Sequence, residues 1–207
     1  MNVRILRASF VIGAIALLTA CSGISRPQPV RQTFLLEPKQ PPAVAQSQTG
    51  ALRVGVVNVA APFRGKAFVY RLGELRFETD FYVEFLVPPA AMLTEQTARA
   101  LVSAKPFTRI AGAGAAADAD WVLDGFASAL YADTRDAGKP IAALTITYYL
   151  TSATGGEQTP VWTHEYTRRA PMRDGSEVAY ADALNTAFGE IVAELAQDLA
   201  KVALPKP

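Results

Sequence analysis

One apolar stripe near the end of the chain does most to limit how this protein folds. Its members follow one another at spacings of three or four residues, which places them all on one side of a helix. They are Ala181, Leu184, Phe188, Ile191, Leu195 and Leu199. Just before them, Asp174 and Glu177 stand three residues apart, as in a capping box that opens a helix. A stripe of this length needs a broad apolar partner, so we predict a long amphipathic closing helix packed on a sheet.

The strands of that sheet are predicted from alternation and from turn residues. Residues 141–151 alternate apolar and polar side chains, and residues 161–167 do so again after a glycine pair at 155–156, which is typical of a hairpin. The valines of 52–59 predict a strand buried on both faces, and residues 38–50 predict a loop between two strands. Further strands and a second helix are predicted from shorter patterns: strands at 32–37, 67–70, 74–79, 81–87, 107–110 and 121–131, and a helix at 90–103.

Together these elements predict a single domain over residues 32–203, of the α/β class in its α+β form, with two main helices packed on a mixed sheet. The composition is 50% hydrophobic and 19% charged, which excludes a wholly disordered chain. The net charge is +1 and no cluster of Lys and Arg occurs, so no nucleic-acid partner is expected. One Cys and one His exclude an internal disulfide framework and any site built from several Cys and His.

The first residues, 1–20, form a predicted lipoprotein signal peptide. Arg4 and Arg7 give a positive start, and an uncharged run from Ala8 to Ala20 follows. This run is shorter than the ~20 residues that a helix needs to cross a bilayer. We therefore expect the segment to be removed rather than to span a membrane.

The end of this run resembles the lipobox of bacterial lipoproteins. Its residues are Leu18, Thr19, Ala20 and Cys21. The small side chains of Thr19 and Ala20 give the signal peptidase access to the bond before Cys21. The Cys21 thiol then carries the lipid. Two or three acyl chains are enough to anchor a protein durably in a membrane. No cofactor is expected beyond this covalent lipid, and residues 21–31 are predicted to be the lipidated cysteine and a tether. Ser22, by resemblance to lipoprotein sorting, favours the outer membrane. The alternative is a secretory peptide followed by an incidental cysteine.

Residues that carry chemistry are few, and each has a plainer interpretation. Residues 112–117 match the letters of a dinucleotide fingerprint but lead into a strand, so no nucleotide site is predicted. His164 stands between aromatic residues within a strand, where a packing or surface role is expected. Two carboxylate pairs lack a calcium-loop pattern and are expected to be solvated: Asp118 with Asp120, and Asp133 with Asp136. We predict no catalytic residue, no metal site and no enzyme activity.

The segment 70–85 interleaves aromatic and charged residues more densely than the rest of the chain. One interpretation is a hairpin with one buried face. The other is a protein-binding surface, because aromatic residues and Arg dominate the anchors of interfaces. The candidate partner-binding residues are Tyr70, Arg71, Phe81, Tyr82 and Phe85.

Five segments in order make the chain resemble a known family. They are LTAC at 18–21, TFLLEP at 33–38, VYR at 69–71, FYVEFLVPP at 81–89 and the closing helix at 176–202. On these residues the chain resembles the ABC-type transport auxiliary lipoproteins, which include relatives of the paraquat-inducible lipoprotein of mammalian-cell-entry (MCE) transport systems. Phe34 stands where Tyr is common, and Phe85 stands where many members have Trp.

The resemblance implies a lipoprotein anchored in the outer membrane and facing the periplasm. It would be the auxiliary subunit of an ABC system that moves phospholipids or other hydrophobic molecules between membranes. It would act by docking to a periplasmic MCE-domain protein, and homo-oligomerisation is a further expectation. The alternative is a structural or regulatory outer-membrane lipoprotein, for example an activator of cell-wall synthesis.

Overall fold

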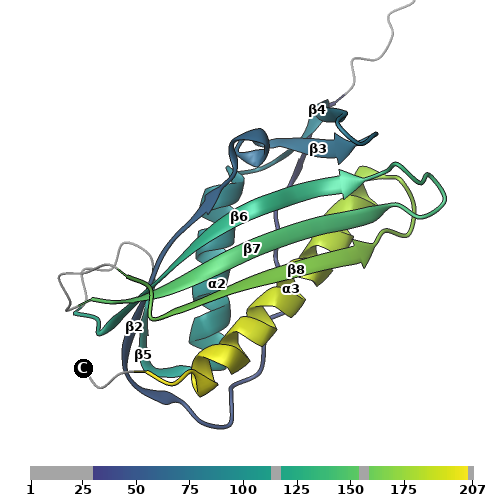
Figure 1. Ribbon diagram of the computed structural model, residues 1–207. Coiled ribbons are helices and arrows are strands. Elements are labelled where there is room, and N and C mark those ends of the chain that lie inside the picture. Colours follow the sequence, from purple (N-terminus) through teal and green to yellow (C-terminus); the bar gives the residue numbers. More distant parts are fainter. Residues whose placement is uncertain (1–29, 113–117, 154–158, 205–207) are drawn as a thin grey trace, which may run out of the picture. The chain divides into compact units, whose positions relative to one another are not determined.

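The computed structural model describes residues 30–112, 118–153 and 159–204 of the chain (Figure 1). The chain divides into residues 1–30 and a compact unit over Arg31–Pro207. Every helix and strand of the described residues lies in this compact unit.

An eight-stranded mixed sheet forms the centre of this unit. Its strands are β1 (Gln32–Phe34), β2 (Gln48–Val59), β3 (Ala67–Arg71), β4 (Phe77–Phe85), β5 (Phe107–Ala111), β6 (Trp121–Asp133), β7 (Ile141–Ser152) and β8 (Trp162–Pro171). The long strand β6 pairs antiparallel with β7 along one edge, and β8 continues the sheet beyond β7. The other edge of β6 pairs in parallel with β2 and then, past a short 3₁₀ turn, with β3. The predicted mixed sheet is confirmed.

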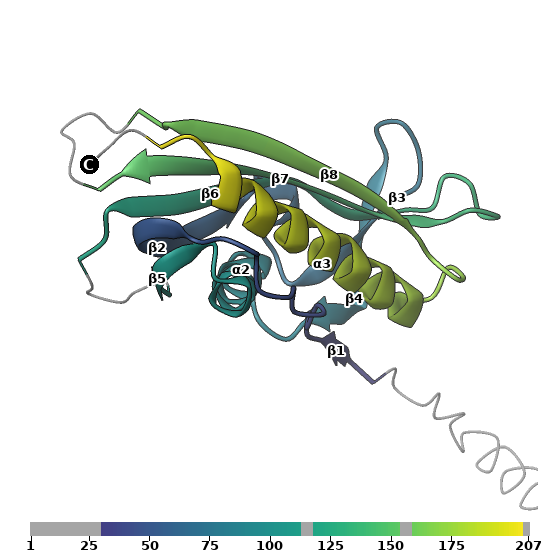
Figure 2. The same ribbon diagram turned by 90° about the horizontal axis from the view of Figure 1, so that it is seen from below.

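Two helices cover one face of the sheet (Figure 2). Helix α2 (Pro89–Ala104) packs mainly on β2, and helix α3 (Glu177–Lys201) packs on β7 and β8. The predicted stripe of α3 is the buried one: Leu184, Phe188, Ile191, Leu195 and Leu199 have no exposed surface. Burying a side chain of this size contributes about 1.5–3 kcal/mol, so the sheet and α3 stabilise each other strongly. The predicted α+β fold with two main helices is confirmed.

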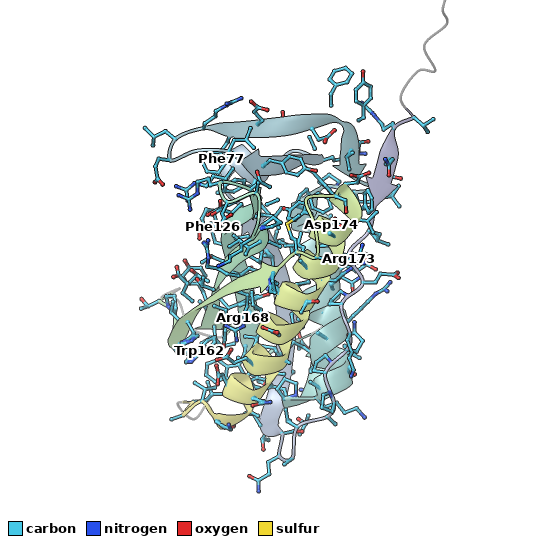
Figure 3. The ribbon with its side chains drawn as sticks, turned by 90° about the vertical axis from the view of Figure 1, so that its right-hand side faces the viewer. Phe77, Phe126, Trp162, Arg168, Arg173 and Asp174 are labelled. Carbon is cyan, nitrogen blue, oxygen red and sulfur yellow. The ribbon has the colours of Figure 1, made fainter. Side chains whose placement is uncertain are left out.

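The start of α3 differs from the predicted capping box. Ser176 is the N-cap, and its Oγ accepts a hydrogen bond from the backbone N–H of Ala179 at 3.2 Å. Asp174 lies before the helix (Figure 3), and its Oδ1 accepts from the backbone N–H of Ser176 at 2.9 Å. Asp174 therefore positions the capping serine, and the box of Asp174 and Glu177 was a wrong prediction.

The segment between β1 and β2 is a strap that crosses both helices. The Ser103 hydroxyl of α2 donates to the Pro41 carbonyl at 3.0 Å, and the Val44 N–H donates to the Ala104 carbonyl at 2.8 Å. At α3, the Glu37 N–H donates to Oδ1 of Asn185 at 2.8 Å. As predicted, this proline-rich segment connects two strands of one sheet.

Two strand predictions were wrong for reasons of packing. Asn58 of β2 is exposed rather than buried, because the helices cover only one face of the sheet. Val56 is also exposed, at an opening that it lines together with Ala91 and Ala98 of α2. Residues 74–79 and 81–87 were predicted as separate strands, but β4 runs continuously over Phe77–Phe85 through an irregularity described next.

Candidate docking surface on the β3–β4 hairpin

A bulge interrupts the pairing of β4 with β3. Val69 is opposite Thr79, but Ala67 is already opposite Glu84, so β4 carries extra residues between these two pairs. Oδ1 of Asp80 accepts hydrogen bonds from the backbone N–H groups of Tyr82 at 2.8 Å and of Val83 at 2.9 Å. A short polar side chain that bonds its own backbone in this way replaces the missing ladder bonds. The sequence therefore builds a fixed projection at this point.

The bulge carries two exposed aromatic rings. Phe81 is 77% exposed, the highest value of any aromatic residue that the structure describes, and Tyr82 is 43% exposed. Their ring centroids lie 5.0 Å apart at an interplanar angle of 79°. We call Phe81 and Tyr82 the aromatic bulge.

Phe85, another predicted partner contact, lies in the core. It is 1% exposed, and its ring centroid is 4.6 Å from that of Phe68. The prediction that Phe85 contacts a partner is wrong, because a covered ring has no surface to offer a partner.

Tyr70 is half-buried on β3 and packs at 6.1 Å from the ring of Tyr180. Burial, together with the nearby carboxylates of Asp80 and Glu177, raises the pKa of Tyr70 above its ordinary value. The phenol therefore stays protonated, and its ring helps to fix the hairpin on α3. Burial raises the pKa of Tyr180 in the same way.

Arg71 organises the turn between β3 and β4. Its Nε donates to the Gly73 carbonyl at 3.3 Å, and its Nη2 donates to the Glu74 carbonyl at 2.9 Å. Its guanidinium carbon lies 5.6 Å from the centroid of the Phe77 ring, which is a cation–π distance. The backbone N–H of Leu72 closes the turn on the Arg76 carbonyl at 2.9 Å. These contacts place Arg71 as a framework residue of the turn.

The turn is also tied to the neighbouring β6–β7 hairpin. Arg135 forms ion pairs with Glu74 of the turn and, at 2.8 Å, with Asp133 at the end of β6. Arg169 of β8 reaches the same Asp133 oxygen at 3.2 Å. The backbone N–H of Thr134 donates to the Arg71 carbonyl at 3.0 Å. Charged side chains thus fix the β3–β4 turn against the end of β6.

Asp133 is therefore not the solvated residue that the sequence predicted. It is only 5% exposed. The hydrogen bonds from Arg135, with a further one from Arg169, lower the pKa of the Asp133 carboxyl to about 2. The carboxylate is ionised at neutral pH and fully engaged by the two arginines, so its role is structural.

The braced turn holds apolar side chains in solvent. Leu75 is 96% exposed, and Leu72 and Phe77 are also exposed. We call Leu72, Leu75 and Phe77 the hairpin tip; Phe77 is labelled in Figure 3. The two leucines of the tip were not among the partner-binding residues predicted from the sequence. The available signal was Leu72 at the predicted turn between the strands, a place where polar residues are usual, whereas Leu75 was assigned to the predicted strand 74–79.

The remaining predicted residues either lie outside the part of the chain that the structure describes or are not gathered into a site within it. Leu18, Thr19, Ala20 and Cys21 lie outside the described residues, as does most of 112–117. His164 is exposed on β8, with its ring 4.6 Å from that of Tyr166 and 6.0 Å from that of Trp162. Within the described part of the chain, no group of His, Cys, Asp and Glu is placed to hold a metal ion. Nor does any helix there have the length and apolarity needed to cross a membrane.

Comparison with solved structures shows that the fold is shared. A protein from Xanthomonas campestris, described by the family name DUF330, aligns with 80% of this chain and 92% of its own length. Its TM-score is 0.71 and its identity 17%. A second structure, described as an uncharacterized protein, covers 82% and 99% at a TM-score of 0.66 and 12% identity. Such identities show the fold alone.

A lipoprotein from Neisseria meningitidis aligns with 73% of this chain and 99% of its own length, at 13% identity. Its TM-score of 0.29 is too low to carry an argument. No family model and no curated protein matches the sequence.

Proposed function

We propose that this protein is a lipoprotein anchored in the outer membrane through Cys21, with its folded unit in the periplasm. It serves as the auxiliary subunit of an MCE-type ABC transport system that moves phospholipids or other hydrophobic molecules. It docks to the periplasmic MCE protein and catalyses no reaction. The lipobox supports the anchor, the five family-like segments support the transport role, and the fold shared with the Xanthomonas protein is compatible with both.

The observation that carries the docking role is the hairpin tip. Leu75 is almost fully exposed, yet the turn around it is held by Arg71 and by the pairing of Glu74 with Arg135. An apolar side chain on a fixed turn loses little conformational freedom on binding. More of the free energy gained by burying it therefore contributes to the affinity. Charged residues flank it, as at the rim of an interface. Arg76 and Glu78 are two of these rim residues.

Co-isolation from native membranes tests this proposal. The tagged, crosslinked protein is purified as wild type, as Leu75→Asp and as Val178→Asp. Val178 is a matched control because it is an exposed valine in the first turn of α3, where an acidic residue suits the helix dipole. We expect the wild type and Val178→Asp to recover an MCE protein with its permease and ATPase, and Leu75→Asp to lose them.

Two other results would contradict the proposal. Recovery of cell-wall enzymes alone would favour the alternative role as a regulator of cell-wall synthesis. Equal recovery of the MCE protein with all three variants would remove the hairpin tip from the interface while keeping the transport role. A His164→Ala variant, at an exposed position of β8, is expected to behave as wild type.

A further inference from the structure

The aromatic bulge lies beside the point where the chain enters the folded unit. Strand β1 runs parallel to β4, with Gln32 directly opposite Val83. Arg31, the first residue of the compact unit, reaches Glu84 with its Nη1 at 3.5 Å. The residues that follow Asp80 on β4 are therefore the neighbours of the first residues of β1.

This position matters because of the short segment that precedes it. Between Cys21 and β1 the chain has only residues 22–31, which reach at most ~35 Å when fully extended. If Cys21 carries the proposed lipid, the edge of the unit formed by β1 and the aromatic bulge stays within that distance of the bilayer. The argument rests on the proposed lipid anchor but on no partner protein.

We propose that Phe81 and Tyr82 are a second membrane contact, which inserts into the headgroup region of the bilayer that holds Cys21. Aromatic side chains concentrate at this depth, where the ring meets apolar surface and a phenol hydroxyl stays hydrated. Lipid anchors of peripheral proteins are commonly combined with a second membrane signal, such as another lipid chain or a basic patch. Both rings project from a bulge that Asp80 fixes through two backbone hydrogen bonds, so they form a rigid wedge.

The charges next to the bulge suit a phospholipid surface. Arg31 is largely exposed, and Lys66 is exposed in part; both share the carboxylate of Glu84, which is mostly covered. The Asp80 oxygen nearest the bulge is occupied by backbone N–H groups. Two cationic side chains share the one carboxylate of Glu84, so an excess of positive charge remains for headgroup phosphates.

A spin label at Phe81 tests the contact directly. If Cys21 is acylated, Phe81→Cys gives the only free thiol in the mature chain, because the sequence has one native cysteine. The acylated protein is reconstituted in vesicles of phosphatidylethanolamine and phosphatidylglycerol. The accessibility of the spin label to two relaxation reagents is then measured. Oxygen partitions into the bilayer, whereas a nickel complex stays in water. Leu75→Cys is the control, since Leu75, like Phe81, is largely open to solvent.

We expect the label at Phe81 to lose access to the nickel complex several-fold relative to the label at Leu75, and to gain access to oxygen. Equal access to the nickel complex at the two sites overturns the proposal. Loss of access to both reagents at Phe81, with spin–spin broadening that fades as labelled protein is diluted with unlabelled protein, also overturns it. That result would assign the bulge to contact with a second copy of the chain.

Mass spectrometry of the same samples separates this inference from the proposed function. Acylated Cys21 with a solvent-exposed label at Phe81 defeats the membrane contact alone. Absence of lipid on Cys21 defeats the anchor and the contact together. The vesicles contain no MCE protein, so the accessibility result does not depend on whether the hairpin tip docks to one.

Discussion

Gly55 of β2 lies directly beneath the carboxylate of Asp124 of β6. A Cβ atom added at Gly55 would lie 2.0 Å from Oδ1 of Asp124. The same oxygen accepts a hydrogen bond from the backbone N–H of Val56 at 3.0 Å. Gly55 and Val56 together oppose the single residue Asp124, because the register shifts between Val54 and Val57. The pair of glycine and aspartate therefore defines a second β-bulge, at the centre of the sheet.

Gly55→Ala is expected to destabilise the protein. The added methyl group forces Asp124 away from the Val56 N–H, and the Leu123 carbonyl at 3.3 Å limits the alternative of moving the backbone. We expect the free energy of unfolding to fall by about 1–3 kcal/mol, as for other overpacked sites. Urea denaturation followed by circular dichroism measures the change.

Gly65→Ala is the control for that experiment, because nothing lies within 4 Å of a Cβ added at Gly65. It should leave the free energy of unfolding unchanged or raise it by up to about 1 kcal/mol through lower entropy of the unfolded chain. Equal losses for Gly55→Ala and Gly65→Ala would show that contact with Asp124 has no special cost.

Phe85→Ala and Phe81→Ala should distinguish a core residue from a surface residue. The sequence had assigned both phenylalanines to the same candidate partner surface. Phe85 is enclosed next to Phe68, so truncation leaves a cavity and is expected to cost about 3–5 kcal/mol. Phe81 is mostly exposed, and its truncation should change the free energy of unfolding by less than about 0.5 kcal/mol. Both values come from urea denaturation. A large loss with Phe81→Ala would mean that the aromatic bulge belongs to the core.

The sequence failed to separate these two phenylalanines for a definable reason. Simple alternation along β4 puts Phe81 on the same face as Val83 and Phe85, both of which are buried. The bulge at Asp80 breaks that alternation and turns Phe81 outward. Bulges of this kind depend on hydrogen bonds between specific atoms, which a hydrophobic pattern does not encode.

Patterns that depend only on local spacing were predicted well. The stripe of α3 and the β7–β8 hairpin follow from periodicity alone, and both were confirmed. The bracing of the hairpin tip could not be predicted. It joins Glu74 to Arg135, and Asp133 to Arg169, and the members of the second pair are 36 positions apart in the chain. Such pairs become visible only when the sheet topology is known.

Ser176→Ala is expected to loosen the start of α3. The substitution removes the acceptor for the Ala179 N–H and should lower the free energy of unfolding by about 1 kcal/mol. Thr186→Ala is a matched loss of a hydroxyl in the same helix, where the side chain only bonds back to the Asp182 carbonyl at 3.1 Å. Alanine favours the helix there, so stability should hold or rise. Equal costs at both positions in thermal unfolding would contradict the assigned N-cap.

Asp133→Asn should change how stability depends on pH. The pKa of Asp133 is about 2 in the folded protein, held down by Arg135, against about 3.9 in an unfolded chain. Its ionised form therefore favours the fold by at most about 2.6 kcal/mol above pH ~4, and this stabilisation is lost as the pH falls toward 2. Urea denaturation from neutral to acidic pH should show a shallower decline for Asp133→Asn than for wild type. Asp118→Asn, the same change at an exposed position, should keep the wild-type decline. Parallel curves for wild type and Asp133→Asn would mean that the two arginines do not stabilise the fold through this carboxylate.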